Sequence, residues 1–144
     1  MSMEAARAEF TSRFTTAWAA DYPTIPVAYQ NRKFSRPTTG PWAEFRVIET
    51  SRTRKNIGTI QSRFVRVTGL ISIEIFVPED SGTKALFDML SKASLYLEEQ
   101  SIPLSTGRSV TTLVAKRSSD GKVNGTERGT ILIPYWLDEY IPTP

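Results

Sequence analysis

The chain contains neither cysteine nor histidine. Without cysteine it has no disulfides, no thiolate metal site and no cysteine nucleophile. Without histidine it lacks the commonest metal ligand and the commonest general base of proteins. We therefore expect no metal, zinc included, and no cofactor, and we assign no catalytic residue.

Long apolar runs and the common catalytic motifs are missing too. No hydrophobic stretch approaches the roughly 20 residues of a membrane span, and the first residues lack the charged-then-apolar pattern of a signal peptide. The glycines do not have the spacing of a phosphate-binding loop, and no Gly-x-Ser-x-Gly elbow or calcium-loop carboxylate pattern occurs. These absences predict a non-enzymatic protein that is made in the cytoplasm and has no membrane partner.

The 144 residues are 40% hydrophobic and 23% charged, which fits one domain, residues 1–144, with a substantial core. The charge is unevenly distributed along this domain. Residues 32–66 contain nine basic residues against Glu44 and Glu49, so this window has a net charge of +7 and the rest of the chain has −4. Such a division suits a polyanion partner, or a second copy that packs its basic side against an acidic side.

The clearest structural pattern is the run of residues 64–78. Apolar β-branched side chains alternate with polar ones along it, which is the period of a half-buried strand. The run is longer than the usual five or six residues, so we expect part of it to extend past the core as one leg of a hairpin. Gly69 is the gap in the inward row and predicts a bulge, a bend or a close backbone approach.

The other leg of this hairpin is predicted at residues 42–53, and the whole hairpin, 42–77, is expected to extend toward a neighbouring subunit. Its tip carries Arg52, Arg54 and Lys55. Two interpretations stay open for these cations, a solvated loop end or a contact with another subunit. In the polar loop before the hairpin, Phe34 either tucks under the loop or anchors a partner.

Two helices and further strands complete the predicted fold. Aromatic residues at helical spacing predict a first helix at 3–20, with a core-facing stripe, and residues after the capping segment 79–83 predict a second helix to about residue 100. The remaining predictions are a short strand at 25–30, a loop at 101–106, a hairpin of strands 110–116 and 130–136, an edge or a bulge at Pro134, and a docking tail at 137–144 that carries Tyr140 and Ile141. The fold class is therefore α+β, a mainly antiparallel or mixed sheet of about five strands with two main helices packed on one face.

This layout resembles the tail terminator, or tail completion, proteins of bacteriophages with long, non-contractile tails. The resemblance is carried by the aromatic helix that ends in Trp18, by the segments 25–31 and 41–47 with Phe34 and Pro37 between them, and by the strand 69–78 with the helix after it. It covers most of the chain up to about residue 97.

The resemblance implies a homo-hexameric ring that sits on the last ring of the tail tube, at the head-proximal end of the tail in the virion. Such a ring stops tube polymerisation and offers the surface to which the head connector attaches. The implied partners are other copies of the chain, the tail tube protein and the head-tail connector or head-completion protein, while DNA passes through the ring lumen without specific binding.

Two alternatives stay open, another head-tail connector or head-completion protein, and a nucleic-acid-binding domain that uses the basic 32–66 window with Phe34 and Trp42 as stacking groups. For the ring, we expect basic positions of the hairpin tip and first loop to meet acidic positions on a neighbour or on the tube. The predicted interface residues are Arg52, Arg54, Lys55, Arg32, Phe34, Arg36, Glu98, Glu99, Asp138 and Glu139.

Overall fold

The computed structural model describes residues 2–30, 32–35, 37, 40–54, 62–78, 83–123 and 125–142. Within them the chain forms two helices and seven strands, which confirms the α+β class and exceeds the predicted five strands. In chain order the elements are α1 (Ser2–Asp21), β1 (Val27–Tyr29), β2 (Trp42–Arg54), β3 (Ser62–Pro78), α2 (Thr83–Leu95), β4 (Ser101–Pro103), β5 (Ser109–Thr112), β6 (Lys116–Val123) and β7 (Thr126–Pro142).

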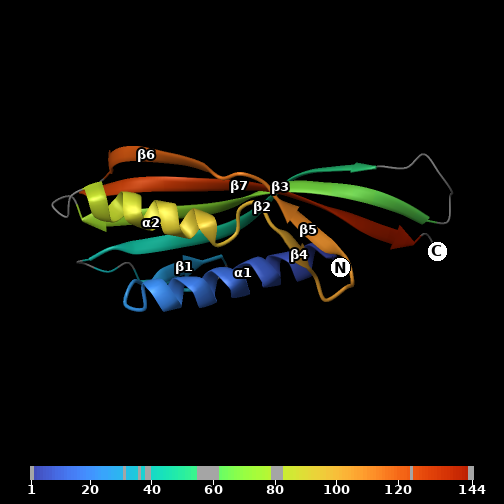
Figure 1. Cartoon of the computed structure of the whole chain (residues 1–144), viewed down its shortest axis with the longest axis horizontal. Coiled ribbons are helices and arrows are strands. Elements are labelled where there is room, and N and C mark those ends of the chain that lie inside the picture. The colour runs from blue at the N-terminus through green and yellow to red at the C-terminus, as the bar shows by residue number, and fades with distance from the viewer. Residues whose placement is uncertain are drawn as a thin grey trace.

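β3 and β7 form the centre of the sheet. They pair antiparallel over their whole length, from Ser62↔Pro142 to Pro78↔Thr126. The strand order is β1-β2-β3-β7-β5-β4, with β1 parallel to β2. On its other side β7 pairs first with β6 and then with β5, so these two strands follow one another along the same side of β7. The result is the long twisted sheet of Figure 1.

Both helices pack on one face of the sheet, and aromatic rings fill the space beneath α1 (Figure 1). Phe14 stacks on Phe45 with 4.6 Å between ring centroids and lies 5.5 Å from the Trp18 ring. Phe10 meets Tyr135 edge-on at 5.2 Å. The aromatic stripe predicted in the first helix is therefore core, and truncating one of its phenylalanines should cost about 3–5 kcal/mol of stability.

Gly69 lies where a side chain would not fit. A Cβ atom at this position would be 2.0 Å from the carbonyl oxygen of Ile48 and 2.4 Å from the Tyr135 hydroxyl. Tyr135 is the β7 partner of Gly69, and its hydroxyl crosses the glycine to donate a hydrogen bond of 2.9 Å to that same carbonyl. The β2 register shifts at this level, between Glu49 and Ser51. Of the alternatives predicted for Gly69, the close backbone approach is confirmed, and the bulge lies opposite it in β2.

Two segments differ from their predictions. Residues 101–106, predicted as a loop, contain β4, which pairs with β5. The tail prediction for 137–144 is wrong through Pro142, because β7 continues to that residue and its backbone pairs with Ser62–Arg66 of β3. The length of β3 explains the second error, since each residue added to β7 finds a backbone partner there.

Pro134 lies in the middle of β7 and not at the end of a strand. Its carbonyl accepts a hydrogen bond of 2.9 Å from the N–H of Leu113, in the segment 113–115 that separates β5 from β6. The nitrogen and the carbonyl of a strand residue point to the same side, so the missing N–H of Pro134 faces this interruption. The proline therefore lies at a local edge, as its chemistry predicts.

The predicted second hairpin differs in its first strand. Residues 110–116 are divided between β5, which ends at Thr112, and β6, which begins at Lys116 and continues to Val123. β6 pairs with β7 with a register shift between Ser119 and Gly121, and residues 124–125 connect the two strands. The second helix ends at Leu95, earlier than predicted, and a turn follows in which Glu99 has a φ of 53°. The predicted capping residues Glu79 and Asp80 lie outside the described residues.

The far ends of three strands form an arm, which we define as residues 51–54 of β2, 62–66 of β3 and 138–142 of β7. Figure 1 shows this end of the sheet extending beyond both helices and beyond β4 and β5. The arm includes the outer part of the predicted 42–77 hairpin. Arg52 and Arg54, predicted at its tip, lie in β2, and the segment 55–61 that connects β2 to β3 lies outside the described residues.

Candidate functional site

The arm holds the first group of predicted interface residues. Arg52 is exposed, with its Nε 3.9 Å from a carboxylate oxygen of Glu49, and a pair so open to solvent contributes little stability. Arg54 is paired through its backbone with Val65 of β3, and Lys55 lies outside the described residues. The structure thus leaves the Arg52 guanidinium close to solvent at the root of the arm.

Two acidic residues of the predicted set are engaged within their own chain. Asp138 accepts two hydrogen bonds from Arg66, at 2.9 and 3.0 Å, and this guanidinium lies 3.9 Å from the centre of the Trp136 ring. The hydrogen bonds to Asp138 raise the pKa of Arg66. Glu139 has only 4% of its surface exposed. Asp138 is therefore paired within its own chain, and Glu139 is buried within it.

Glu98 and Glu99 lie in the turn that follows α2. This turn packs against residues 113–115, the interruption between β5 and β6. Glu98 accepts a hydrogen bond of 2.7 Å from the Ala115 N–H, and the Glu99 N–H donates one of 3.2 Å to the Leu113 carbonyl. The buried Thr112 hydroxyl donates to the Leu97 carbonyl beneath them. This network fixes the turn, and it leaves the Glu99 side chain exposed.

The interruption itself presents apolar side chains to solvent, and we call residues 113–115 with Glu99 the edge knob. Leu113 is 45% exposed and Val114 61% exposed. They border an open groove of about 640 Å³ that Pro134 and Glu99 also line. Sequence reasoning missed these two residues, although two consecutive apolar residues in a strand cannot both face the same core.

The opposite edge of the sheet is concave. A groove of about 460 Å³, which we call the α1–β1 groove, is lined by Glu4, Arg7, Ala8, Thr11, Ser12, Tyr29, Gln30, Arg32 and Phe45. Gln30 organises it, because its side-chain oxygen accepts hydrogen bonds from the Val47 N–H at 3.0 Å and from Arg7 at 3.3 Å. Arg32 lies 5.7 Å from the centre of the Tyr29 ring. Of these residues, the sequence singled out Arg32.

A sequence model of the phage tail terminator family matches residues 5–125. The chain belongs to the phage tail terminator family. One solved structure matches 99% of this chain and 99% of its own length with a TM-score of 0.74 at 18% identity, a likeness that shows the fold. No curated protein sequence matches the chain.

Membership makes this tail terminator a structural component of the virion tail that interacts with other phage tail or head proteins. Among the described residues, no three potential metal ligands of the acidic, histidine or cysteine type come together. Neither described helix is long and apolar enough to cross a membrane.

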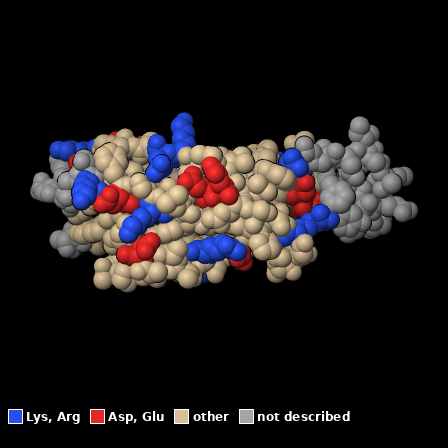
Figure 2. Space-filling model, viewed as in Figure 1, with Lys and Arg blue, Asp and Glu red and all other residues tan. Residues whose placement is uncertain are grey.

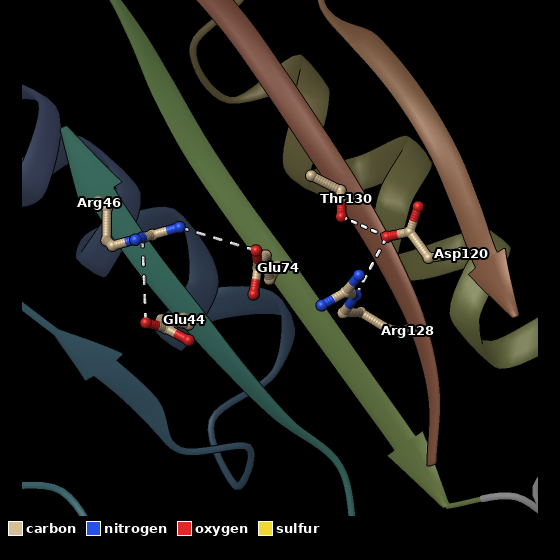
Figure 3. A network of polar contacts seen from close by, with 6 residues as sticks. All are labelled: Glu44, Arg46, Glu74, Asp120, Arg128 and Thr130. Atoms are coloured by element: carbon tan, nitrogen blue, oxygen red, sulfur yellow. Dashed lines mark hydrogen bonds and ion pairs between the residues drawn. The ribbon is translucent and has the colours of Figure 1, made fainter. Parts of the chain in front are cut away.

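The basic window of this tail terminator is partly neutralised on the outer face of the sheet, away from the helices. Arg46 lies 3.9 Å from Glu44 and 3.7 Å from Glu74, and Figure 3 shows the three side chains directed toward one another across β2 and β3. Farther along the same face, Arg128 and Thr130 of β7 both donate to Asp120 of β6 (Figure 3). On the face seen in Figure 2, basic and acidic side chains are interspersed.

Phe34 of the first loop is packed within the chain. Its ring lies 5.4 Å from the Trp42 ring, which stacks on Phe76 at 4.1 Å. This contact corresponds to the tucked alternative for Phe34. The Trp42 ring is thus stacked on Phe76 and also lies close to Phe34. Arg36 lies outside the described residues.

Proposed function

We propose that this tail terminator closes into a homo-hexameric ring on the head-proximal end of the tail tube, stops tube polymerisation and offers the surface to which the head connector attaches. Family membership supports the tail role. The observation that carries the ring is the pair of unlike edges on one sheet, an apolar, acidic edge knob and a concave groove that carries Arg7 and Arg32. A closed ring needs such unlike surfaces, because each copy presents one to each neighbour.

In physical terms, this function is the burial of a growing end. The last ring of a polymerising tube presents unpaired strands, loops and charges that template the next ring. A terminator satisfies these groups with one surface and presents above it a surface without the same template. The proposal requires binding and shape complementarity and no chemistry.

The arm is our proposed contact with the tube or with the next copy. Arg52, Arg54 and Lys55 follow one another along the hairpin toward its tip, and Figure 1 shows that the arm extends away from the helices. We propose the first loop, with Arg32, Phe34 and Arg36, as a second contact region. We propose that DNA passes through the lumen without specific binding. Strong rings of cations in the lumen would attract the DNA phosphates and slow the passage of the DNA.

The experiment is electron microscopy of the purified protein, alone and with polymerising tail tube protein from the same genome. We expect rings, and rings seated on tube ends. Reversing Arg52, Arg54 and Lys55 to Glu should abolish seating while the circular dichroism spectrum and thermal midpoint remain near those of wild type.

The matched control reverses three cations away from the arm, Lys84, Lys116 and Arg117, which are exposed on α2 and β6. Rings of this control should still seat. Normal seating of the arm variant would refute the arm contact, and tubes that remain uncapped by wild-type protein would refute the function.

A further inference from the structure

The edge knob is held in place by a hydrogen-bonded turn. Glu99 holds a φ of 53°, a backbone conformation that side chains other than glycine adopt at a cost, and its N–H is bound to the Leu113 carbonyl. Thr112, 2% exposed, holds the turn from below through the Leu97 carbonyl and the Gln100 N–H. A strained turn, fixed on both sides, thus holds an acid beside the exposed apolar residues Leu113 and Val114.

The α1–β1 groove has complementary chemistry. Its floor includes the Phe45 and Tyr29 rings, and the exposed Arg7 and Arg32 supply two cations against the carboxylate of Glu4. β1 pairs with β2 only from Ala43 to Phe45, and past this point the Gln30 side chain takes the place of a strand at the Val47 N–H. The groove is therefore an indentation where the sheet edge loses its covering strand.

The two features lie at the same level on opposite edges of the sheet. Val47 at the groove pairs with Ile71, and Ile71 pairs with Ile133 of β7. The next residue of β7, Pro134, accepts the hydrogen bond from Leu113 in the knob. A second copy placed beside the first can therefore bring its knob to this groove with almost no slide along the strands. Repetition of one such head-to-tail contact gives a ring when its rotation closes.

We propose that the edge knob of each copy seats in the α1–β1 groove of the next, with Leu113 and Val114 over the apolar floor and Glu99 beside Arg7 and Arg32. The occupant is a second copy of this chain, because one molecule carries both an exposed apolar surface with an acid and a groove with an apolar floor and two cations. This contact rests on the proposed ring and assigns its subunit interface.

A charge exchange tests the contact. Glu99→Arg, and separately Arg7→Glu with Arg32→Glu, should each raise the concentration for half-assembly roughly tenfold or more, measured by sedimentation and native mass spectrometry of the full chain. The chain with all three substitutions should recover assembly, because both partners are reversed together. Glu99→Gln, which removes the charge without reversing it, should give an intermediate loss. Lys84→Glu and Asp88→Arg, exposed on α2, are the charge controls.

The apolar half of the contact has its own matched pair. Val114→Asp should prevent assembly, whereas Phe87→Asp, at a 49% exposed apolar residue of α2, should leave it unchanged. Normal ring assembly by either charge-reversal variant, or a folded triple variant that fails to recover assembly, would overturn this interface and leave the proposed function standing. A wild-type chain that forms no ring, even with tube ends, would overturn the function and the interface together.

Discussion

Replacing Gly69 by alanine tests the packing on which the centre of the sheet depends. The added Cβ would lie 2.0 Å from the Ile48 carbonyl oxygen and 2.4 Å from the Tyr135 hydroxyl. Overpacking of this kind costs about 1–3 kcal/mol, and expelling the Tyr135 hydroxyl from its hydrogen bond costs about 1–3 kcal/mol more. Alanine recovers about 0.5–1 kcal/mol in the strand, so we expect a net loss of about 1–5.5 kcal/mol.

The assay is urea unfolding at a protein concentration where the chain is monomeric, with a thermal midpoint expected to fall by roughly 10 °C. Gly129→Ala is the matched control, because the three atoms nearest its added Cβ belong to the side chains of Leu90 and Leu86, the nearest at 2.6 Å. The ends of these buried side chains can shift more easily than a backbone carbonyl, and no hydrogen bond is lost, so the control should lose less, near the lower end of about 1–3 kcal/mol. Equal losses at the two glycines would refute the close-approach argument.

Three further predictions concern side chains of the core and the surface. Thr112→Val removes a buried hydroxyl that bonds Leu97 and Gln100, and urea unfolding should show a loss of about 1–3 kcal/mol; no loss would show that the turn holds without it. Burial raises the pKa of Tyr135 to about 12 from 10.0, so stability should hold below pH 10 and fall as the pH rises from 10 toward 12. Tyr135→Phe should show less of this fall between pH 9 and 11.5, and an equal fall in both proteins would contradict the assignment. Phe34→Ala should lose about 1 kcal/mol, because its ring packs near Trp42; an unchanged midpoint with weaker ring or tube binding would instead favour the partner-anchor interpretation.

The sequence predicted the parts of the fold that follow from local periodicity. The first helix, the long β2–β3 hairpin and the close approach at Gly69 all follow from spacing of two or of three to four residues, which fixes the face on which each side chain lies. The extent of β7 could not be read this way. Its last residues are held by the backbone of β3, a partner that no local pattern indicates.

The candidate site was harder to predict from the sequence, because its contacts also depend on partners that no local pattern indicates. The sequence marked charges, and it could not show that Asp138 is taken by Arg66 of its own chain or that Glu139 is 4% exposed. Leu113 and Val114 gave a signal that we missed, two adjacent apolar residues in the predicted strand 110–116. The groove opposite them is made by α1 and the end of β1, which only the tertiary structure brings together.

The most direct measurement of the central claim is the length distribution of tail tubes grown with increasing amounts of the wild-type protein. A terminator acts at tube ends, so elongation should stop when the protein reaches about one ring per growing end, far below the amount of tube protein, and every stopped end should carry a ring in electron micrographs. Tubes that continue to elongate at that ratio, with no ring at their ends, would contradict the account.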